Sequence, residues 1–380
     1  MATLIVKRGN ANIYSMVKKK TMKKRVLFVV QGAAGGVSRY LIDIISNMDS
    51  DKYQVGVVYN SQFEDERFRN WRILSNNIQF FNLKTLVREI SLENDISACM
   101  TIVKIINNFK PNVVHAQSSK AGLIARIAAR IKHVHRIVYT PHAYAFLSPE
   151  FSKGKRFLYR MAERFLSRYF TDITINCSYS EHYQAIKARI DRCSKLKVIP
   201  NAVPAIHGLN RSVERARLGV KSDRIIVGTL ARVSPQKNPE LFEKIASAVS
   251  KLNSDILFVW IGTNSQERKS RDVIFKGEMS QSQELLAGID LYLSTSLFEG
   301  LSYSLLEAAS VGIPVLASNV PGNDDFISKY NYGFSFELDD PIPKISQQII
   351  SLLQNPRLKK LQPAVQGFSS MIEETLSTYN

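Results

Sequence analysis

The chain has 380 residues, too many for one ordinary core, so its length predicts two domains, and its composition of 45% hydrophobic and 22% charged residues is that of a soluble globular protein. It holds no apolar run near the roughly 20 residues that span a bilayer, and its three cysteines form no Cys-x-x-Cys pair, so the sequence predicts no transmembrane helix, zinc site or disulfide framework and favours the reducing cytoplasm. The net charge of +18 comes from the first half, because residues 1–200 hold 33 Lys and Arg against 14 Asp and Glu, and such an excess favours an anionic partner.

Residues 1–21 differ from the rest of the chain. They contain Lys18-Lys19-Lys20 but no apolar core of the kind that a secretory signal needs. Met22-Lys23-Lys24-Arg25, followed by a buried type of strand, resembles a natural protein start. We therefore expect residues 1–21 to be a disordered extension.

Short apolar runs alternate with amphipathic segments over residues 22–200. The runs are rich in β-branched residues, as in the buried strands of parallel sheets, and lie at residues 26–30, 55–59, 113–115, 137–139, 173–176 and 197–199. The segments between them have helical spacing and lie at residues 39–48, 96–108, 121–131, 156–168 and 181–189. This alternation predicts a first doubly wound α/β domain over residues 22–200.

A second series of the same kind follows a connector rich in proline and glycine. Its predicted strands lie at residues 225–229, 256–261, 273–275, 291–294 and 315–318, with helices at 239–252 and 304–311. We expect a second doubly wound domain over residues 201–364, and a C-terminal helix at about 365–380 that packs back on the first domain. Two such domains that face each other leave a ligand-binding cleft between the carboxyl ends of their strands.

The segment Gln31-Gly32-Ala33-Ala34-Gly35-Gly36-Val37-Ser38 follows the first predicted strand and opens the first helix. Glycines at such a point let backbone N–H groups approach an anion at the positive end of the helix. The segment is neither a G-x-G-x-x-G fingerprint nor a P-loop, so a tight turn without a ligand is the alternative.

His142 lies in the segment Thr140-Pro141-His142-Ala143-Tyr144, just after a predicted strand. At that place its side chain faces the cleft, where a neutral imidazole can hydrogen-bond to a sugar hydroxyl or a phosphate. A structural histidine of the loop or core is the alternative.

Arg232 and Lys237 lie five residues apart on a loop at the end of a predicted strand. Two cations on such a loop can converge on a diphosphate, whereas a solvated charge pair is the alternative.

Glu299 lies in the loop before a predicted helix, and Glu307 lies on the second turn of that helix. Their carboxylates can accept hydrogen bonds from the sugar and ribose hydroxyls of one nucleotide sugar, and the free N–H groups at the helix start can hold phosphate oxygens. The alternative is one charge at a helix N-terminus and one exposed helical glutamate.

Together and in this order, the four segments resemble the retaining glycosyltransferases of family 4, which have the GT-B fold of two Rossmann-like domains that face each other across a cleft. The resemblance runs from about Lys23 to about Asp340 and includes the E-x7-E signature from Glu299 to Glu307. Two departures are Asn201-Ala202 in place of Asn-Gly, and a glycine-rich turn reduced to Ile261-Gly262-Thr263-Asn264.

The resemblance implies a role for each site residue. Gly35 and Gly36 form the loop beside the reacting centre, and His142 contacts the transferred sugar. Arg232 and Lys237 hold the donor diphosphate and stabilise the departing nucleotide, as a metal does elsewhere.

The second domain supplies the remaining contacts that the resemblance implies. The sugar is positioned by Glu299 and by the amides of Gly300, Leu301 and Ser302. Glu307 takes the ribose hydroxyls, and the base packs near Phe275-Lys276-Gly277, which makes Lys276 a donor-binding residue.

The implied reaction transfers a hexosyl group from a nucleoside-diphosphate sugar, with UDP favoured, to an acceptor hydroxyl and retains the anomeric configuration. No metal cofactor is expected, because the D-x-D match at Asp49-Ser50-Asp51 lies in a polar connector rather than at a buried strand end. The resemblance also implies a lipid-linked glycan acceptor in the synthesis of capsule, O-antigen or exopolysaccharide.

The basic first half favours an anionic membrane surface as a further partner. Arg156, Arg160, Arg164 and Arg168 recur every four residues with Phe157 and Phe165 among them, as in an interfacial helix; a solvated basic helix is the alternative. We expect a cytoplasmic protein, peripheral at the inner face of the cell membrane.

Three other functions fit the sequence less well. A nucleic-acid-binding protein fits only the charge, because the chain has no helix-turn-helix, zinc-finger or RNA-recognition signature. A nucleotide-sugar epimerase on a similar fold disagrees with the E-x7-E pair. A non-catalytic sugar-binding relative would be expected to lack a motif residue, and none is missing.

Overall fold

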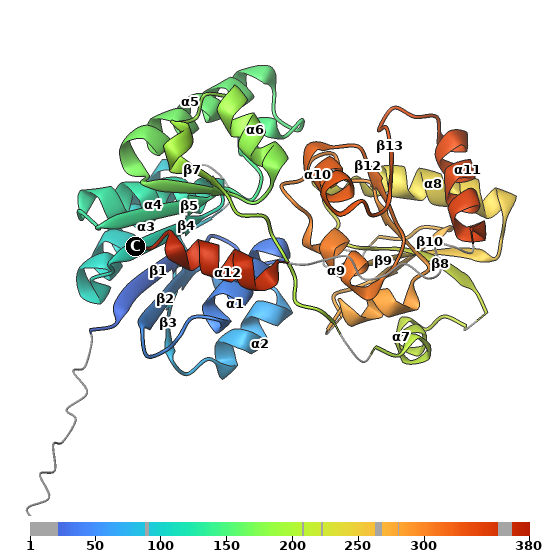
Figure 1. Ribbon diagram of the computed structural model, residues 1–380, viewed down its shortest axis with the longest axis horizontal. Helices are drawn as coiled ribbons and strands as arrows, with labels where there is room; N and C mark the ends of the chain where they lie inside the picture. The colour runs from blue at the N-terminus through green and yellow to red at the C-terminus, as the bar shows by residue number, and fades with distance from the viewer. Residues whose placement is uncertain are drawn as a thin grey trace, which may run out of the picture.

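The computed structural model describes residues 22–87, 91–206, 209–221, 223–262, 268–279, 281–355 and 367–380. Within these ranges the strands form one seven-stranded and one six-stranded sheet. Each sheet is parallel and flanked by helices, and the two form separate lobes that lie side by side (Figure 1). The predicted fold class of two Rossmann-like domains is confirmed. The extension expected at residues 1–21 lies outside the described residues.

The first lobe has the strand order β3-β2-β1-β4-β5-β6-β7. Its strands are β1 (Lys24–Val29), β2 (Tyr53–Tyr59), β3 (Ile78–Asn82), β4 (Val113–Gln117), β5 (Arg136–Thr140), β6 (Ile173–Asn176) and β7 (Leu196–Val198). Its helices are α1 (Gly36–Ser46), α2 (Glu66–Leu74), α3 (Leu92–Phe109), α4 (Ser119–Ile131), α5 (Lys153–Phe170) and α6 (Tyr179–Lys187), with 3-10 turns η1 (Ser61–Phe63), η2 (Ala145–Leu147) and η3 (Cys193–Lys195).

The second lobe has the order β10-β9-β8-β11-β12-β13. Its strands are β8 (Ile225–Leu230), β9 (Ile256–Ile261), β10 (Val273–Lys276), β11 (Leu291–Ser294), β12 (Val315–Ser318) and β13 (Phe334–Phe336). Its helices are α7 (Arg211–Leu218), α8 (Pro239–Leu252), α9 (Tyr303–Val311), α10 (Pro321–Tyr330) and α11 (Ile342–Gln354), with 3-10 turns η4 (Pro235–Lys237) and η5 (Glu284–Gly288). A last helix, α12 (Phe368–Ser377), follows.

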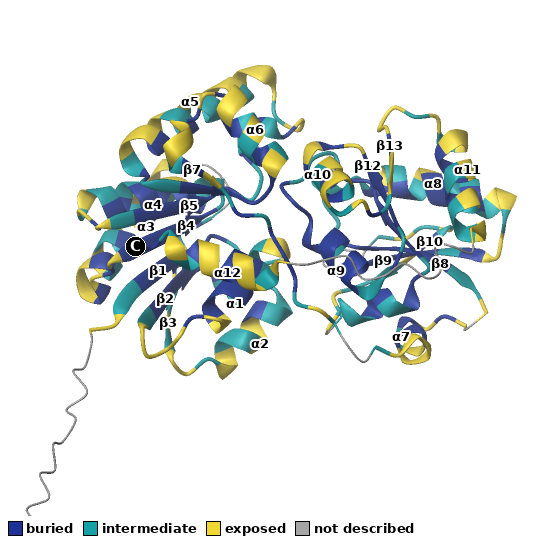
Figure 2. Ribbon diagram, in the orientation of Figure 1, coloured by how far each residue is buried: buried dark blue, intermediate teal, exposed yellow. Residues whose placement is uncertain are grey.

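The central strands are buried on both faces, which explains why they are near-continuous apolar runs in the sequence. In β1 the four residues 26–29 are fully buried, and the middle of each sheet is dark blue in Figure 2. The edge strands β3 and β13 are only partly buried and were missed in the sequence, as was α2, of which only Phe68 is buried. Partial burial leaves no continuous apolar run to recognise.

The last residues of the chain lie on the first lobe. Helix α12 packs against α1 (Figure 1), although α11 before it belongs to the second lobe. The Tyr379 hydroxyl lies 2.8 Å from Nδ1 of the buried His115, and Lys24 Nζ donates to Asn380 Oδ1 at 2.6 Å. The strands of the two lobes end at Val198 and begin again at Ile225, and the exact boundary between the predicted domains stays a prediction.

In both sheets, successive strands are added first on one side of the first strand and then on its other side. The reversal lies between β1 and β4 in the first lobe and between β8 and β11 in the second. Ligands of open α/β sheets bind outside the carboxyl ends of the strands at such points. The glycine segment follows β1, the Arg232 loop follows β8 and the Glu299 loop follows β11, so the topology directs three predicted site segments to these points.

Candidate active site

A cleft of about 900 Å³ lies between the lobes, and both lobes line it. Its lining contains nearly all of the predicted site residues, namely Gly35, Gly36, His142, Arg232, Lys237, Glu299, Gly300, Leu301, Ser302 and Glu307. Lys276 is not among the lining residues; its Nζ lies 3.5 Å from the position that a Cβ on Gly219 would take. The structure therefore brings the predicted set together with that one exception, and the role of each residue stays a prediction.

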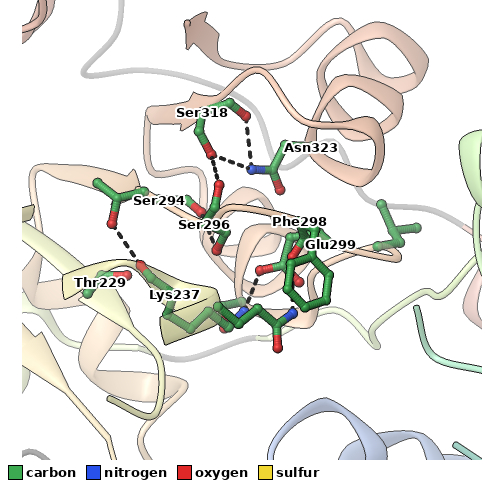
Figure 3. A network of polar contacts seen from close by, with 12 residues as sticks. Thr229, Lys237, Ser294, Ser296, Phe298, Glu299, Ser318 and Asn323 are labelled. Carbon is green, nitrogen blue, oxygen red and sulfur yellow. Dashed lines mark hydrogen bonds and ion pairs between the residues drawn. The ribbon is translucent and has the colours of Figure 1, made fainter. Parts of the chain in front are cut away.

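The loop that carries Glu299 is held from several sides (Figure 3). Ser318 Oγ donates to the Ser296 carbonyl at 2.6 Å, and Asn323 Nδ2 donates to the Ser318 carbonyl at 3.0 Å. Gly322 in α10 touches the same loop, because a Cβ there would lie 2.3 Å from the Gly300 carbonyl oxygen. A carboxylate on so constrained a loop is preorganised for a ligand.

Glu299 and Lys237 form an ion pair in the cleft wall (Figure 3). The distance from Nζ to Oε1 is 2.5 Å, and the two side chains are only 7% and 19% exposed, respectively. A hydrogen bond joins the Lys237 loop to the Glu299 loop, because Thr295 Oγ1 of the latter donates to the Lys237 carbonyl at 2.9 Å. A cation and a carboxylate therefore lie side by side in a cleft that the exposed Arg232 also lines.

The glycine segment is shaped by a residue that sequence reasoning missed. Gly35 has φ +62°, a conformation that favours glycine, and its N–H donates to Asp65 Oδ2 at 2.8 Å. Ser38 Oγ donates to the other oxygen of Asp65 at 2.9 Å. Because Asp65 also caps α2, it joins the glycine turn to that helix, and burial raises the pKa of its carboxyl group.

Glycines also mark the points where the lobes touch. A Cβ on Gly36 would lie 3.2 Å from the Tyr303 ring of the second lobe, and a Cβ on Gly300 would lie 2.9 Å from Cys177 Sγ of the first. The connector joins the contact, because Asn201 Nδ2 donates to the Leu301 carbonyl at 3.0 Å. The small residues thus allow the two halves of the cleft to approach.

His142 adopts φ +53° at the cleft wall, and its Nε2 lies 2.7 Å from Gln117 Oε1. Burial lowers the pKa of His142 to about 3, so its imidazole is neutral at physiological pH. With Gln117 Oε1 as acceptor, the proton sits on Nε2 and Nδ1 is an acceptor for a hydroxyl group.

The buried Glu181 positions the His142 loop. Its two carboxylate oxygens accept the N–H groups of Ala143 and Cys177, each at 2.7 Å. Burial raises the pKa of Glu181. The sequence offers one signal for its role, since Ser178 and Glu181 have the spacing of a capping box at the start of α6.

Glu307 contacts two arginines of the first lobe that sequence reasoning did not single out. Its Oε1 lies 3.4 Å from Arg39 Nη1 and 3.9 Å from Arg67 Nη1. Arg39 also donates from Nε to Asp43 at 2.7 Å, a pair whose spacing of four residues is visible in the sequence. Glu307 therefore ties α9 to α1 and α2 across the cleft.

Gly262 at the end of β9 lines the cleft as well. It has φ +147°, and a Cβ there would lie 2.2 Å from the Ala231 carbonyl oxygen, so only glycine fits beside the Arg232 loop. Thr263 and Asn264 of the glycine-poor turn lie outside the described residues.

Comparisons with known proteins show the family. The profile of Glycosyltransferase Family 4 matches residues 34–205, and that of Glycosyl transferases group 1 matches residues 210–365. An Escherichia coli protein, UDP-Gal:alpha-D-GlcNAc-diphosphoundecaprenol alpha-1,3-galactosyltransferase, is 30% identical over 70% of this chain and 73% of its own length. The chain belongs to glycosyltransferase family 4.

Two further proteins resemble this glycosyltransferase. The capsular polysaccharide biosynthesis glycosyltransferase CapM of Staphylococcus aureus is 24% identical over 77% of this chain and 83% of its own. The crystal structure of Anabaena HepE in complex with UDP and glucose superposes with a TM-score of 0.75, at 19% identity, over 93% of this chain and 98% of that one. The structural likeness supports the GT-B fold.

Proposed function

We propose that this glycosyltransferase moves a hexosyl group from a UDP-sugar to a hydroxyl group of a lipid-linked glycan, in the synthesis of a capsule, O-antigen or exopolysaccharide. The observation that carries the proposal is the meeting of Arg232, Lys237 and Glu299 with His142 in one cleft. The UDP bound to HepE and the diphosphate-linked lipid acceptor in the name of the E. coli relative support the donor and acceptor classes.

In the proposed reaction the acceptor oxygen bonds to the anomeric carbon as the bond from that carbon to the UDP oxygen breaks. Attack on the face from which UDP leaves retains the configuration, and the acceptor proton passes to the departing phosphate. Arg232 and Lys237 stabilise the charge on that phosphate, so that no metal ion is needed. Glu299 and the neutral His142 hold the sugar hydroxyls.

A panel of UDP-, GDP- and ADP-sugars tests the donor class. A ligand that binds only the folded protein raises the free energy of unfolding by about 2.7 kcal/mol at a hundred times its Kd. We expect UDP-sugars to raise the melting temperature and Arg232→Ala to weaken UDP binding in calorimetry. A wild-type protein that binds no nucleotide sugar would refute the proposal.

We further propose that α5 docks on the anionic inner face of the cell membrane. Within the described ranges, no helix is both long and apolar enough to cross a bilayer. On α5, however, Phe157, Leu158 and Phe165 are 53%, 66% and 56% exposed beside its arginines. Exposed apolar side chains of this kind can insert among the lipid chains while the arginines contact the anionic headgroups.

Vesicle binding tests the docking. We expect Phe157→Ser with Leu158→Ser to reduce cosedimentation with vesicles that contain phosphatidylglycerol, and wild-type binding to need the anionic lipid. The matched control is Leu252→Ser on the second lobe, where the side chain is 61% exposed. Equal losses in both variants would contradict docking through α5.

A further inference from the structure

A separate groove of about 450 Å³ lies between α5 and α6, outside the cleft. We call it the basic groove; its lining includes Lys153, Arg156, Arg160 and Lys187 together with Phe146 and Phe157. Among the residues that the structure describes, no acidic side chain lines it. The carboxylates of α5 and α6 are engaged elsewhere, since Glu163 pairs with Arg126 and Glu181 binds backbone N–H groups.

The arginines of α5 near the basic groove repel one another. Arg164, the next arginine along α5, has its pKa lowered by burial and by repulsion from Arg160, Arg168 and Arg189. Within the groove, Arg160 Nε is buried and has no hydrogen-bond acceptor among the described residues. An anion in the basic groove would reduce the repulsion among these arginines and could accept hydrogen bonds from their guanidinium groups.

The basic groove lies between the exposed apolar face of α5 and the active-site loop. Phe146 belongs to η2, which follows the His142 loop directly, and four residues of chain span at most about 14 Å. Arg156 Nε donates to the Phe146 carbonyl at 2.9 Å and so fixes α5 to that turn. Phe157 lines the groove and is still half exposed, and the next residue, Leu158, is 66% exposed.

We propose that the basic groove binds the diphosphate of the lipid-linked acceptor. The lipid chain then lies along the apolar face of α5, and the glycan extends past η2 toward His142. Arginine suits this task because its planar guanidinium forms paired hydrogen bonds with phosphate oxygens. A phospholipid headgroup could bind anywhere on a basic surface, whereas this groove is fixed to the turn that follows the His142 loop. Its position therefore favours the acceptor over an ordinary phospholipid as the ligand. This inference rests on the proposed function.

The test measures binding of farnesyl diphosphate, a short prenyl diphosphate, with UDP present at saturation to occupy the donor site. We expect Arg160→Gln with Lys187→Gln to raise its Kd at least tenfold. The matched control is Arg168→Gln with Arg192→Gln, which removes the same charge from a neighbouring hollow that includes Asp191. The control should change the Kd less than twofold. The exposed Lys187→Gln alone, with an expected rise of about threefold, serves if the double variant does not fold.

Two results would overturn the inference. One is an equal change, or none, in the groove and control variants. The other is a groove variant that loses binding to phosphatidylglycerol vesicles but keeps the Kd for farnesyl diphosphate, which would assign the basic groove to phospholipid. Failure of the proposed function gives a different result, because the wild-type protein would then show no saturable UDP binding.

Discussion

At the scale of single residues, the reacting centre depends on one ion pair. Glu299 and Lys237 are each largely buried and lie 2.5 Å apart, on two loops that follow different strands. In the proposed mechanism the lysine holds the diphosphate and the glutamate holds the sugar. Each side chain also keeps the other in position, so a change at either one affects both tasks.

We expect Glu299→Gln to lower kcat by roughly 100- to 1,000-fold, because a neutral amide neither pairs with Lys237 nor stabilises the sugar as a carboxylate does. The measurement is UDP release with the sugar nucleotide that binds in the panel. Glu373→Gln, at an exposed site of α12, is the control and should keep its activity. Wild-type turnover by a folded Glu299→Gln enzyme would remove Glu299 from the mechanism.

Gly322 tests how tightly the Glu299 loop is held. Alanine there would place Cβ 2.3 Å from the Gly300 carbonyl oxygen and 2.8 Å from that of Glu299, so we expect Gly322→Ala to lower the free energy of unfolding by about 1–3 kcal/mol. Gly154→Ala is matched, because Gly154 is likewise the second residue of its helix but has open space around it. In the control we expect no loss, since alanine favours a helix. If urea denaturation gives the same free energy of unfolding for both variants, the close contact at Gly322 is contradicted.

At the scale of elements, α12 joins the end of the chain to the first lobe. The Tyr379 ring is buried against Phe28 and His115, and its hydroxyl group meets His115 Nδ1. His115 Nε2 lies 2.9 Å from Thr140 Oγ1. The residues that follow α12 therefore complete the core next to the end of β5, the strand that leads into the His142 loop.

We expect Tyr379→Phe to lower the free energy of unfolding by about 1–3 kcal/mol, because it leaves a buried nitrogen of His115 without a partner. Thermal and urea unfolding measure the change. Tyr183→Phe removes the same hydroxyl group from a side chain that is 60% exposed and should have little effect. If both variants unfold alike, the contact between Tyr379 and His115 does not stabilise the lobe.

At the scale of the whole molecule, stability depends on pH through two histidines, the fully buried His115 and the partly buried His142. Burial lowers the pKa of His115 and of His142 to about 3, from an ordinary value of 6.5. The unfolded chain therefore binds more protons than the folded protein between these values, and folding is less favourable as the pH falls below 6.5. Each histidine lowers the free energy of unfolding by about 1.4 kcal/mol when the pH falls from 7.5 to 5.5.

We expect His115→Gln to remove about 1.4 kcal/mol from the fall in unfolding free energy between these two pH values. Urea denaturation at both pH values gives that difference, whatever the absolute stability of the variant. His135→Gln, at an exposed site, should leave the pH dependence unchanged. An unchanged pH dependence in His115→Gln would mean that His115 titrates normally in the folded protein.

The fold follows from the sequence to a large extent, because buried parallel strands leave continuous apolar runs and the helices between them leave an amphipathic pattern. The motif residues on loops after those strands were also predictable, since the carboxyl ends of parallel strands meet at one edge of a sheet. Segments such as β3, β13 and α2 were not, because they are only partly buried and their pattern is weak.

The contacts across the cleft were decided by the tertiary structure alone. The sequence separates Arg39 from Glu307 by 268 residues, and nothing in either motif pairs them. The same holds for Tyr379 with His115, and for the basic groove, where side chains of α5 and α6 meet at a turn of the active-site loop. Local patterns determine which elements form and which face they bury; the packing of two lobes determines which charges meet, because that depends on geometry between residues distant in the chain.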